Sequence, residues 1–416
     1  MRSNNRDITA PCFVLGINEG MLGLFGIAIL LVTAVVWSAR GPNVEKTDFV
    51  LTYVGAHIVH DGSGARLYDI KFQKQVRDSL FQHPNPLFYE HPPFEALFLS
   101  PLAALPFRTA YLLWGLLNVV VWLAVIIFMR PYFPCPKEDL GYLLLWVLFA
   151  PLAVALYQGQ SSLILLALYA VAFVKLQHHE EFSAGLWLGL GLFKFQFVLP
   201  FALIFLLRKR WRFLEGFAAS SLLLTLISLL AVGWKGIVNY VRFLLAISGN
   251  PQNLSYGSAV DMPTLYGFVY ALVGRRIGHM ELNFVVMVLS ILLIGFIAWY
   301  WESHDEHDSN ALMFASGVSA ALLTGLHMFT HDFSPLALGL FIALANSPKR
   351  KHRELRWTLT ATVVLFWTVP IYFLFVAWHC LYLLCPVLLL FAFSTLLASK
   401  YVGRQAPTEV ECVTAG

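Results

Sequence analysis

Long apolar runs recur along the whole chain, and they limit its possible folds more than any other feature. Of the 416 residues, 58% are hydrophobic and only 12% are charged, whereas soluble proteins carry about 25% charged residues. A run of about 20 apolar residues can span a bilayer as a helix, and lipid cannot satisfy open backbone groups. The sequence therefore predicts an all-α polytopic membrane protein and excludes an ordinary soluble domain and a disordered chain.

Twelve apolar segments are candidates for membrane-spanning helices. They cover residues 20–38, 108–129, 141–157, 160–176, 182–194, 196–207, 213–233, 283–301, 309–327, 333–347, 356–372 and 379–398. The fifth and sixth segments meet at Lys194, and they form either one long tilted helix or two short ones. Several prolines make the stretch 92–107 interfacial or re-entrant rather than spanning.

Basic residues in short loops predict the orientation, because cytoplasmic loops are enriched in Lys and Arg. Clusters lie at 208–212 and 349–356, and others lie near both ends of the chain and after the second segment. Twelve spans with a cytoplasmic N-terminus place every cluster in the cytoplasm. The long first loop, 39–107, and the loop 234–282 then fall on the outer face, which becomes the working surface.

Several classes of function leave no trace in the sequence. The net charge of +4 is too small to indicate nucleic-acid binding. The five cysteines form no CxxC and no Cys/His ligand pattern, so neither a disulfide framework nor a zinc site is predicted. No Walker loop, GxSxG, HExxH or dinucleotide fingerprint is present. The polar tracts 178–181 and 302–308 are interpreted as solvated turns.

Asp48 is the first candidate for chemistry. It follows the first apolar segment, within residues 45–49 (EKTDF), where a carboxylate at the membrane surface could act on a lipid-borne substrate. The alternative is structural, because Thr47 or Asp48 could cap a helix over 49–60.

Aromatic and amide side chains on the predicted outer face are further candidates. Tyr89 and His91 precede two prolines that make a stiff corner, although a structural turn with interfacial aromatics is the simpler interpretation. Gln158 and Gln160 lie between two spans, where amides could hold sugar hydroxyls or only cap helix ends.

Lys194 interrupts an otherwise apolar stretch, 186–207. A charge at such depth costs about 2.5–3.5 kcal/mol, so it usually has a partner or a ligand. A lysine suits a lipid phosphate, and the alternative is a side chain that reaches the interface.

The turn 325–332 holds His327, His331 and Asp332 at the outer end of a span. These residues could bind a metal, move protons or hold a phosphate. Contact with phosphate or sugar is favoured over a metal site, which would need the right helix phase.

A set of short motifs in fixed order carries a resemblance to a known family. The motifs are Thr47-Asp48-Phe49 with Tyr53, Leu67-Tyr68-Asp69, Tyr89 to Phe94 (YEHPPF), Pro101-Leu102, Leu105-Pro106, Gly159-Gln160, Ala184-Gly185, Gly189, and Lys194 through Pro200 to Arg210-Trp211-Arg212. Together they resemble the integral-membrane glycosyltransferases of family 87, in the GT-C superfamily, which include polyprenol-phosphate-mannose-dependent mannosyltransferases. The turn 327–332 resembles the family's polar turn near the donor site.

The resemblance implies a function and a location. The expected enzyme is a hexosyltransferase that moves mannose or another hexose from a polyprenyl-phosphate donor to a hydroxyl of a glycolipid or glycan acceptor, with inversion. It would work among lipids, without nucleic acid, at the outer face of the plasma membrane.

The resemblance also implies roles for individual residues. Asp48 matches the general base. The residues expected to neutralise the donor phosphate are Lys194, His327 and His331. The residues expected to bind sugar or acceptor are Tyr53, Tyr89, His91, Gln158, Gln160 and Asp332. Many GT-C enzymes carry an acidic pair at the base position, whereas here the second acid is Glu45, so metal-independent transfer without a cofactor is expected.

The same resemblance suggests an organisation in three parts. Residues 1–215 would form a GT-C-like catalytic membrane module with interfacial helices in its first loop. Residues 216–400 would form a variable membrane module that completes the donor site, and 401–416 a disordered cytoplasmic tail.

Two other classes of function compete with this one. A transporter or flippase of a lipid-linked or amphiphilic solute would use Lys194 and the outer histidines as a substrate path. Secondary transporters often repeat broken helices in two halves, and the back half of this chain does not echo the front. A scaffold without substrate is disfavoured, because ionisable residues near lipid are costly to retain.

Overall fold

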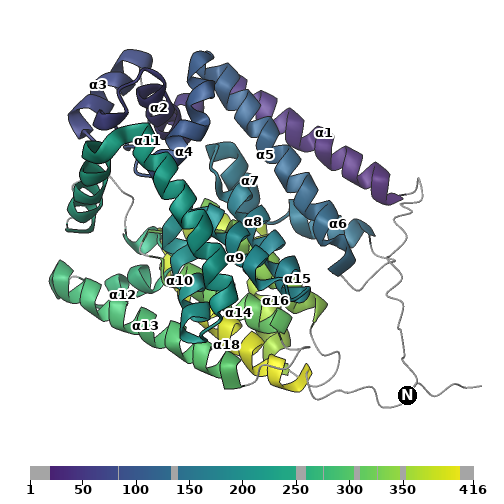
Figure 1. Cartoon of the computed structure of the whole chain (residues 1–416). Helices are drawn as coiled ribbons and strands as arrows, with labels where there is room; N and C mark the ends of the chain where they lie inside the picture. Colours follow the sequence, from purple (N-terminus) through teal and green to yellow (C-terminus); the bar gives the residue numbers. More distant parts are fainter. Residues whose placement is uncertain are drawn as a thin grey trace, which may run out of the picture.

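The computed structural model describes residues 19–82, 84–132, 139–249, 259–274, 276–303, 310–325, 327–346 and 353–402. All regular elements within these ranges are helices (Figure 1), in agreement with the all-α prediction. Most of the predicted tail, 403–416, lies outside the described residues.

Eighteen α-helices are labelled along the described chain. The first ten are α1 (Glu19–Arg40), α2 (Phe49–His60), α3 (Ile70–Leu80), α4 (Pro93–Leu99), α5 (Phe107–Met129), α6 (Asp139–Val147), α7 (Ala150–Gln158), α8 (Ser162–Gln177), α9 (Glu181–Gly189) and α10 (Phe195–Leu207). The others are α11 (Trp211–Gly249), α12 (Leu265–Val273), α13 (His279–Ser303), α14 (Asn310–Leu323), α15 (Ser334–Ala345), α16 (Arg353–Trp367), α17 (Val369–Ala377) and α18 (Leu384–Val402). Two 3₁₀ turns matter below, η5 (Leu190–Lys194) and η9 (Thr330–Phe333).

The predicted number of twelve spans is not confirmed, although all twelve apolar segments contain helix. By length and composition, six helices in the described ranges can cross a bilayer, or up to eight if each of two bent pairs is one span. The pairs are α6–α7, bent by 47°, and α16–α17, bent by 74°. Pro151 and Pro370 stand in the first turn of α7 and α17, where proline is accepted but cannot continue a preceding helix.

The stretch 181–207 folds back on itself at Lys194. By length and composition it counts as one span of 27 residues, which would be about 40 Å long if straight. However, Arg210, just after α10, forms an ion pair of 2.5 Å with Glu181, the first residue of α9. The break lies at Lys194, whose backbone angles (φ −119°, ψ 58°) are not helical. The stretch is therefore two short helices with Lys194 at the tip between them.

Glycines bring α9 and α11 into direct backbone contact. A Cβ atom at Gly185 would stand 1.9 Å from the carbonyl oxygen of Phe213, and one at Gly216 would stand 1.9 Å from that of Phe182. Small residues of this kind let membrane helices approach closely. Further along, α11 bends at Gly233 (φ 66°, ψ 177°), a backbone conformation that glycine alone adopts without strain.

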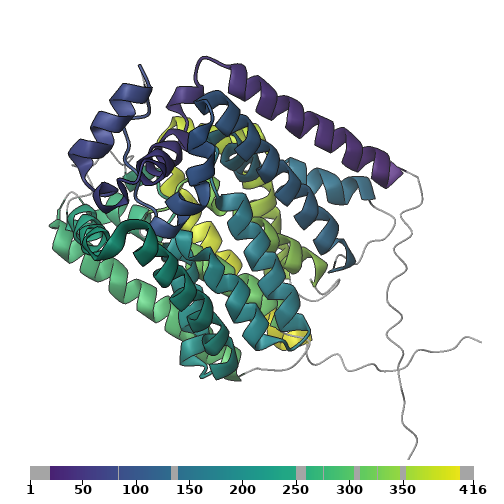
Figure 2. The same cartoon turned by 45° about the horizontal axis from the view of Figure 1, so that its top comes forward.

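The first loop folds into a separate layer at one end of the helical bundle. Its helices α2, α3 and α4 lie together there in both views (Figures 1 and 2). They share an apolar core that includes Tyr53 and Tyr89 and is completed by Tyr111 and Trp114 of α5, whereas the bundle has its own core. The predicted loop 39–107 thus contains the expected helices, and its outward orientation stays a prediction.

Candidate functional site

A small cavity lies between the first-loop layer and the bundle. Most of the predicted site residues line it, and they come from both predicted modules, 1–215 and 216–400. They are Asp48, Tyr89, His91, Gln160, Lys194, His327, His331 and Asp332. Tyr53 and Gln158 do not line it. The fold therefore brings together polar residues that are up to 284 positions apart in the sequence, from Asp48 to Asp332.

Asp48 stands at the N-cap position of α2, but its side chain makes no capping hydrogen bond. The carboxylate instead accepts hydrogen bonds from Asn85 Nδ2 at 3.1 Å and from Gln160 Nε2 at 2.8 Å. Thr47 does not cap α2 either, because its hydroxyl donates to the carbonyl oxygen of Val44. The structural alternative for Asp48 is thus not what the chain adopts, and its carboxylate faces the cavity.

The turn between α7 and α8 positions both glutamines around Asp48. It reverses at Gly159, which has a left-handed backbone (φ 66°) and ends α7, and Trp114 Nε1 donates to the Gly159 carbonyl at 2.8 Å. Gln158 Oε1 accepts from the backbone N–H of Asp48 at 3.1 Å. Gln158 therefore holds the backbone of Asp48 from outside the cavity, and Gln160 holds its carboxylate from inside.

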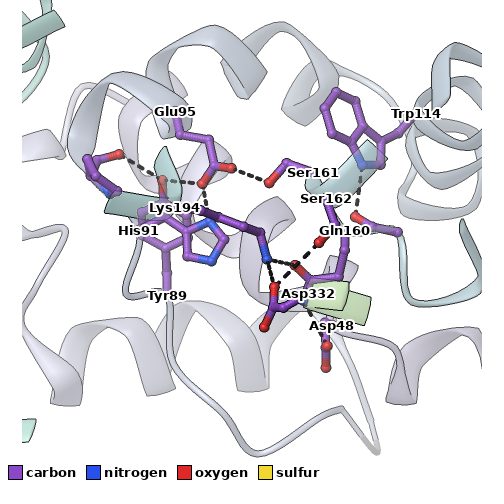
Figure 3. A network of polar contacts seen from close by, with 12 residues as sticks. Asp48, Tyr89, His91, Glu95, Trp114, Gln160, Ser161, Ser162, Lys194 and Asp332 are labelled. Carbon is purple, nitrogen blue, oxygen red and sulfur yellow. Dashed lines mark hydrogen bonds and ion pairs between the residues drawn. The ribbon is translucent and has the colours of Figure 1, made fainter. Parts of the chain in front are cut away.

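Lys194 and Asp332 form an ion pair buried at the base of the cavity (Figure 3). Their side chains are only 3% and 4% exposed. Lys194 Nζ also donates to Gln160 Oε1 at 3.2 Å, so this amide bridges Asp48 and the lysine. Asp332 accepts further from the backbone N–H of Phe329 at 3.1 Å, and Ser162 Oγ lies 3.5 Å from it. The lysine has a protein partner, as its depth predicted.

His331 lies between two carboxylates. Its Nδ1 is 3.8 Å from Asp48 Oδ2, and its Nε2 is 3.4 Å from Asp332 Oδ2. Burial lowers the pKa of His331 and outweighs the opposing effect of these carboxylates. The imidazole is therefore neutral at pH 7, and it is close enough to Asp48 to exchange a proton after a small movement.

A second buried pair is formed by His91, which lines the cavity, and Glu95 (Figure 3). Glu95 also accepts from Tyr89 at 3.2 Å and from Ser161 at 2.9 Å. Burial opposes the charge on His91, but the attraction and the hydrogen bond of Glu95 prevail and raise the pKa of His91. Burial likewise opposes the charge on Glu95, and His91 prevails and lowers the pKa of Glu95.

This pair should make stability depend on pH. Because the pKa of His91 is raised in the folded protein, its stabilisation is complete below its ordinary pKa of 6.5 and is lost as pH rises through the folded pKa. The difference in melting temperature between the wild type and His91→Gln should therefore be largest below pH 6.5 and shrink as pH rises through the raised pKa of His91. A difference that is constant with pH would contradict the ion pair.

Three consecutive residues at the start of α8 each hold a different acid. Residues 160–162 (QSS) donate, in order, to Asp48, Glu95 and Asp332 (Figure 3). The sequence analysis identified only the glutamine, because serines at such a position are ordinary helix caps. Their position before an apolar helix was the only available signal.

Other contributors to the site were missed or misplaced by sequence reasoning. Asn85 touches Asp48 and also receives support from Arg77, which donates to the carbonyl oxygens of residues 85–87, most closely to Pro86 at 2.7 Å. Nothing in the sequence marks Asn85. Tyr53, in contrast, is buried in the first-loop layer and donates to the Leu105 carbonyl at 2.7 Å, so it supports the layer rather than the cavity.

Metal ligation has little support in this arrangement. Within the described ranges, no group of three or more His, Cys, Asp or Glu residues is arranged to hold a metal ion. Asp48, Glu95 and Asp332 are held by amides, hydroxyls, Lys194 and His91. Metal-independent transfer stays a prediction.

Comparison with known proteins gives one match. The family model of glycosyltransferase family 87 matches residues 89–325, more than half of the 416-residue chain. The match includes Tyr89, Gln160 and Lys194 and ends just before the turn that holds His331. Neither a curated protein nor a solved structure matches the chain.

Proposed function

The chain belongs to glycosyltransferase family 87, and from this premise we propose that it transfers a hexose such as mannose from a polyprenyl phosphate to an acceptor hydroxyl. Asp48 is the general base, and the acceptor is a glycolipid or glycan. The site faces outward from the plasma membrane. Family membership favours this function over transport of a lipid-linked solute.

The observation that carries the proposal is the environment of Asp48. Its carboxylate lies in the cavity and is fixed by two neutral amides. Glu95 and Asp332, in contrast, are each engaged in a buried ion pair. A general base must be ionised, fixed in place and able to reach the reacting hydroxyl. Asp48 meets these requirements better than either of the paired acids.

The reaction then follows from the arrangement. The acceptor oxygen forms a bond to the anomeric carbon while its proton passes to Asp48. The bond from the anomeric carbon to the phosphate oxygen breaks on the opposite face, so the anomeric configuration inverts. Both electrons of that bond leave with the polyprenyl phosphate.

Cationic groups near the cavity can stabilise the leaving phosphate. An ammonium group has three N–H donors, and Lys194 uses two of them, on Gln160 and Asp332. One donor remains for a phosphate oxygen. His331 and His327 line the same cavity, and either can gain a proton as negative charge develops. Such contacts are strong in a poorly hydrated site.

An apolar groove of about 1010 Å³ offers a place for the polyprenyl chain. It lies between α10, α11 and α13 and includes Leu203, Ile291 and Ile294. Its wall α10 begins one residue after Lys194 and carries Gln196, which lines the cavity. A lipid phosphate in the cavity would therefore find a hydrocarbon surface one to two helical turns away.

A bulky side chain in this groove should weaken binding of the polyprenyl-phosphate donor. Ile291→Trp replaces an aliphatic side chain with a larger aromatic one at a groove position that is 57% exposed. Because the position is exposed, folding should be unaffected. The KM for a long-chain donor should rise about tenfold, the equivalent of roughly two methylene groups at about 0.8 kcal/mol each. A donor with one or two isoprene units should be unaffected.

Leu292→Trp is the matched control, because Leu292 is the next residue of α13, is 62% exposed and does not line the groove. Equal KM values for the two variants with the long-chain donor would contradict the assignment of the groove.

The outward orientation is supported by charge. Lys194 lies at the tip of the α9–α10 hairpin. Arg208 and Arg210 lie at the opposite, open end, where Arg210 pairs with Glu181. Because basic loops favour the cytoplasm, the cavity belongs on the outer side.

The direct test is a transfer assay with the purified protein. Labelled polyprenyl-phosphate mannose is incubated with a panel of glycolipid and glycan acceptors. The expected result is a new glycosidic bond of inverted configuration, measured by NMR, with release of polyprenyl phosphate. Movement of labelled lipid across proteoliposomes without bond formation would support transport instead.

A further inference from the structure

Glu90 is the cavity acid that the proposed chemistry does not use. It is one of the residues that line the cavity. Among the described residues it has neither a hydrogen bond nor an ion pair, whereas Asp48, Glu95 and Asp332 all have protein partners. Among the described residues, no protein group therefore occupies either of its carboxylate oxygens, and a ligand in the cavity could use them.

The backbone on both sides of Glu90 is held firmly. Gln73, which is 1% exposed, accepts from the Tyr89 N–H at 2.7 Å and donates to the Tyr89 carbonyl at 3.1 Å. Tyr68 donates to the His91 carbonyl at 2.7 Å, and its own ring packs 4.5 Å from the ring of Tyr240. Because the backbone is already fixed, only the side chain of Glu90 has to be ordered when a ligand binds.

Glu90 and the proposed base have different charged or polar neighbours. Glu90 acts electrostatically on His91, His327 and Tyr240, whereas Asp48 acts on His331. The two acids therefore act on different histidines of the same cavity.

The chemistry of a free carboxylate limits its ligand. It accepts hydrogen bonds and donates none, so it repels a phosphate and is left desolvated by an apolar group. Two adjacent hydroxyl groups fit it, because each can donate to one carboxylate oxygen. We propose that Glu90 binds a pair of neighbouring hydroxyl groups on a sugar and is a specificity-determining residue. This inference rests on the proposed function.

Glu90→Gln tests the proposal, and two lipid probes and one kinetic constant identify which sugar is bound. The probes are polyprenyl-phosphate mannose and sugar-free polyprenyl phosphate. If the donor sugar is bound, the variant should bind the first probe about 10- to 100-fold more weakly and the second equally well. If the acceptor sugar is bound, both lipids should bind normally and the acceptor KM should rise by a similar factor.

In both cases kcat should change little, because Glu90 takes no part in the proton transfer. A variant with unchanged donor affinity and unchanged acceptor KM overturns the proposal. A fall in kcat alone also overturns it, because that result would make Glu90 part of the chemical step.

Glu45→Gln is the matched control. It removes one carboxylate from the same loop layer, but Glu45 does not line the cavity. The affinities for both lipid probes and the acceptor KM should therefore match those of the wild type. A deoxy form of the bound sugar adds a second check, since removal of the hydroxyl should weaken binding to the wild type and not to Glu90→Gln.

The outcome is separable from that of the proposed function. A wild type that transfers no sugar defeats the proposed function, whereas an active wild type with a normal Glu90→Gln variant defeats only the role of Glu90.

Discussion

Replacement of Asp48 with asparagine should lower the rate of sugar transfer by a factor of about 10²–10⁴. Asparagine has the same size, but its amide cannot take the acceptor proton. Asn85 and Gln160 both donate to Asp48, so one of them would face an amide N–H₂ group in the variant. A loss of stability of about 1–3 kcal/mol is therefore expected as well. Single-turnover rates measured well below the melting temperature separate the two effects.

Binding of polyprenyl-phosphate mannose should persist in Asp48→Asn, because the general base acts on the acceptor. Glu45→Gln serves as the control, with an unchanged rate. If Asp48→Asn turned over normally, Asp48 could not be the base, and the proposed mechanism would fail.

Replacement of Lys194 with methionine should destabilise the folded protein by about 3–5 kcal/mol. Asp332 would keep its charge at 4% exposure without its cation, and burial of an uncompensated charge is far more costly than loss of an exposed ion pair. The free energy of unfolding in detergent measures this effect. Lys175→Met is the matched control, because its ion pair with Glu180 is 32% and 49% exposed, and its loss should cost at most about 1 kcal/mol.

The double variant Lys194→Met with Asp332→Leu separates stability from function. Removal of both charges should restore most of the lost stability, while transfer should stay impaired because the phosphate loses a donor. Equal destabilisation of Lys194→Met and Lys175→Met would contradict the prediction that the buried ion pair contributes more to the free energy of unfolding than the exposed one. Full activity in the double variant would remove Lys194 from the proposed phosphate site.

Hydropathy predicted helices correctly but not how many of them cross the membrane. An apolar helix looks the same in sequence whether lipid or protein covers it. α14 and α15, with 14 and 12 residues, are buried within the bundle over almost their whole length. The hairpin at Lys194 was only one of two alternatives, because the contact that reveals it joins Glu181 and Arg210, which lie 29 positions apart in the sequence, and no local pattern indicates it.

The candidate site was more predictable than the number of spans. Polar residues are costly in an apolar chain, so Asp48, Lys194 and Asp332 stood out and do line one cavity. Tyr53 was misplaced because a tyrosine hydroxyl can be satisfied by any nearby carbonyl, here that of Leu105. Asn85 was missed because polar loop residues are common.

Glu95 carried a signal that was overlooked. It follows His91 by four residues, and this spacing often pairs opposite charges on one helix face. Here the pair is buried at the start of α4 rather than on a helix surface, because two prolines turn the chain between the partners. Its burial depends on Ser161 of a distant helix, which no local pattern indicates.

The contiguity of residues 160–162 limits how this enzyme can change over time. Deletion or insertion of one residue there would put these side chains out of register with their partners, and Asp48, Glu95 and Asp332 would each lose the hydrogen bond that this segment supplies. Single substitutions remove one donor and leave the other two. The first turn of α8 should therefore accept exchanges of residue type but no change in length.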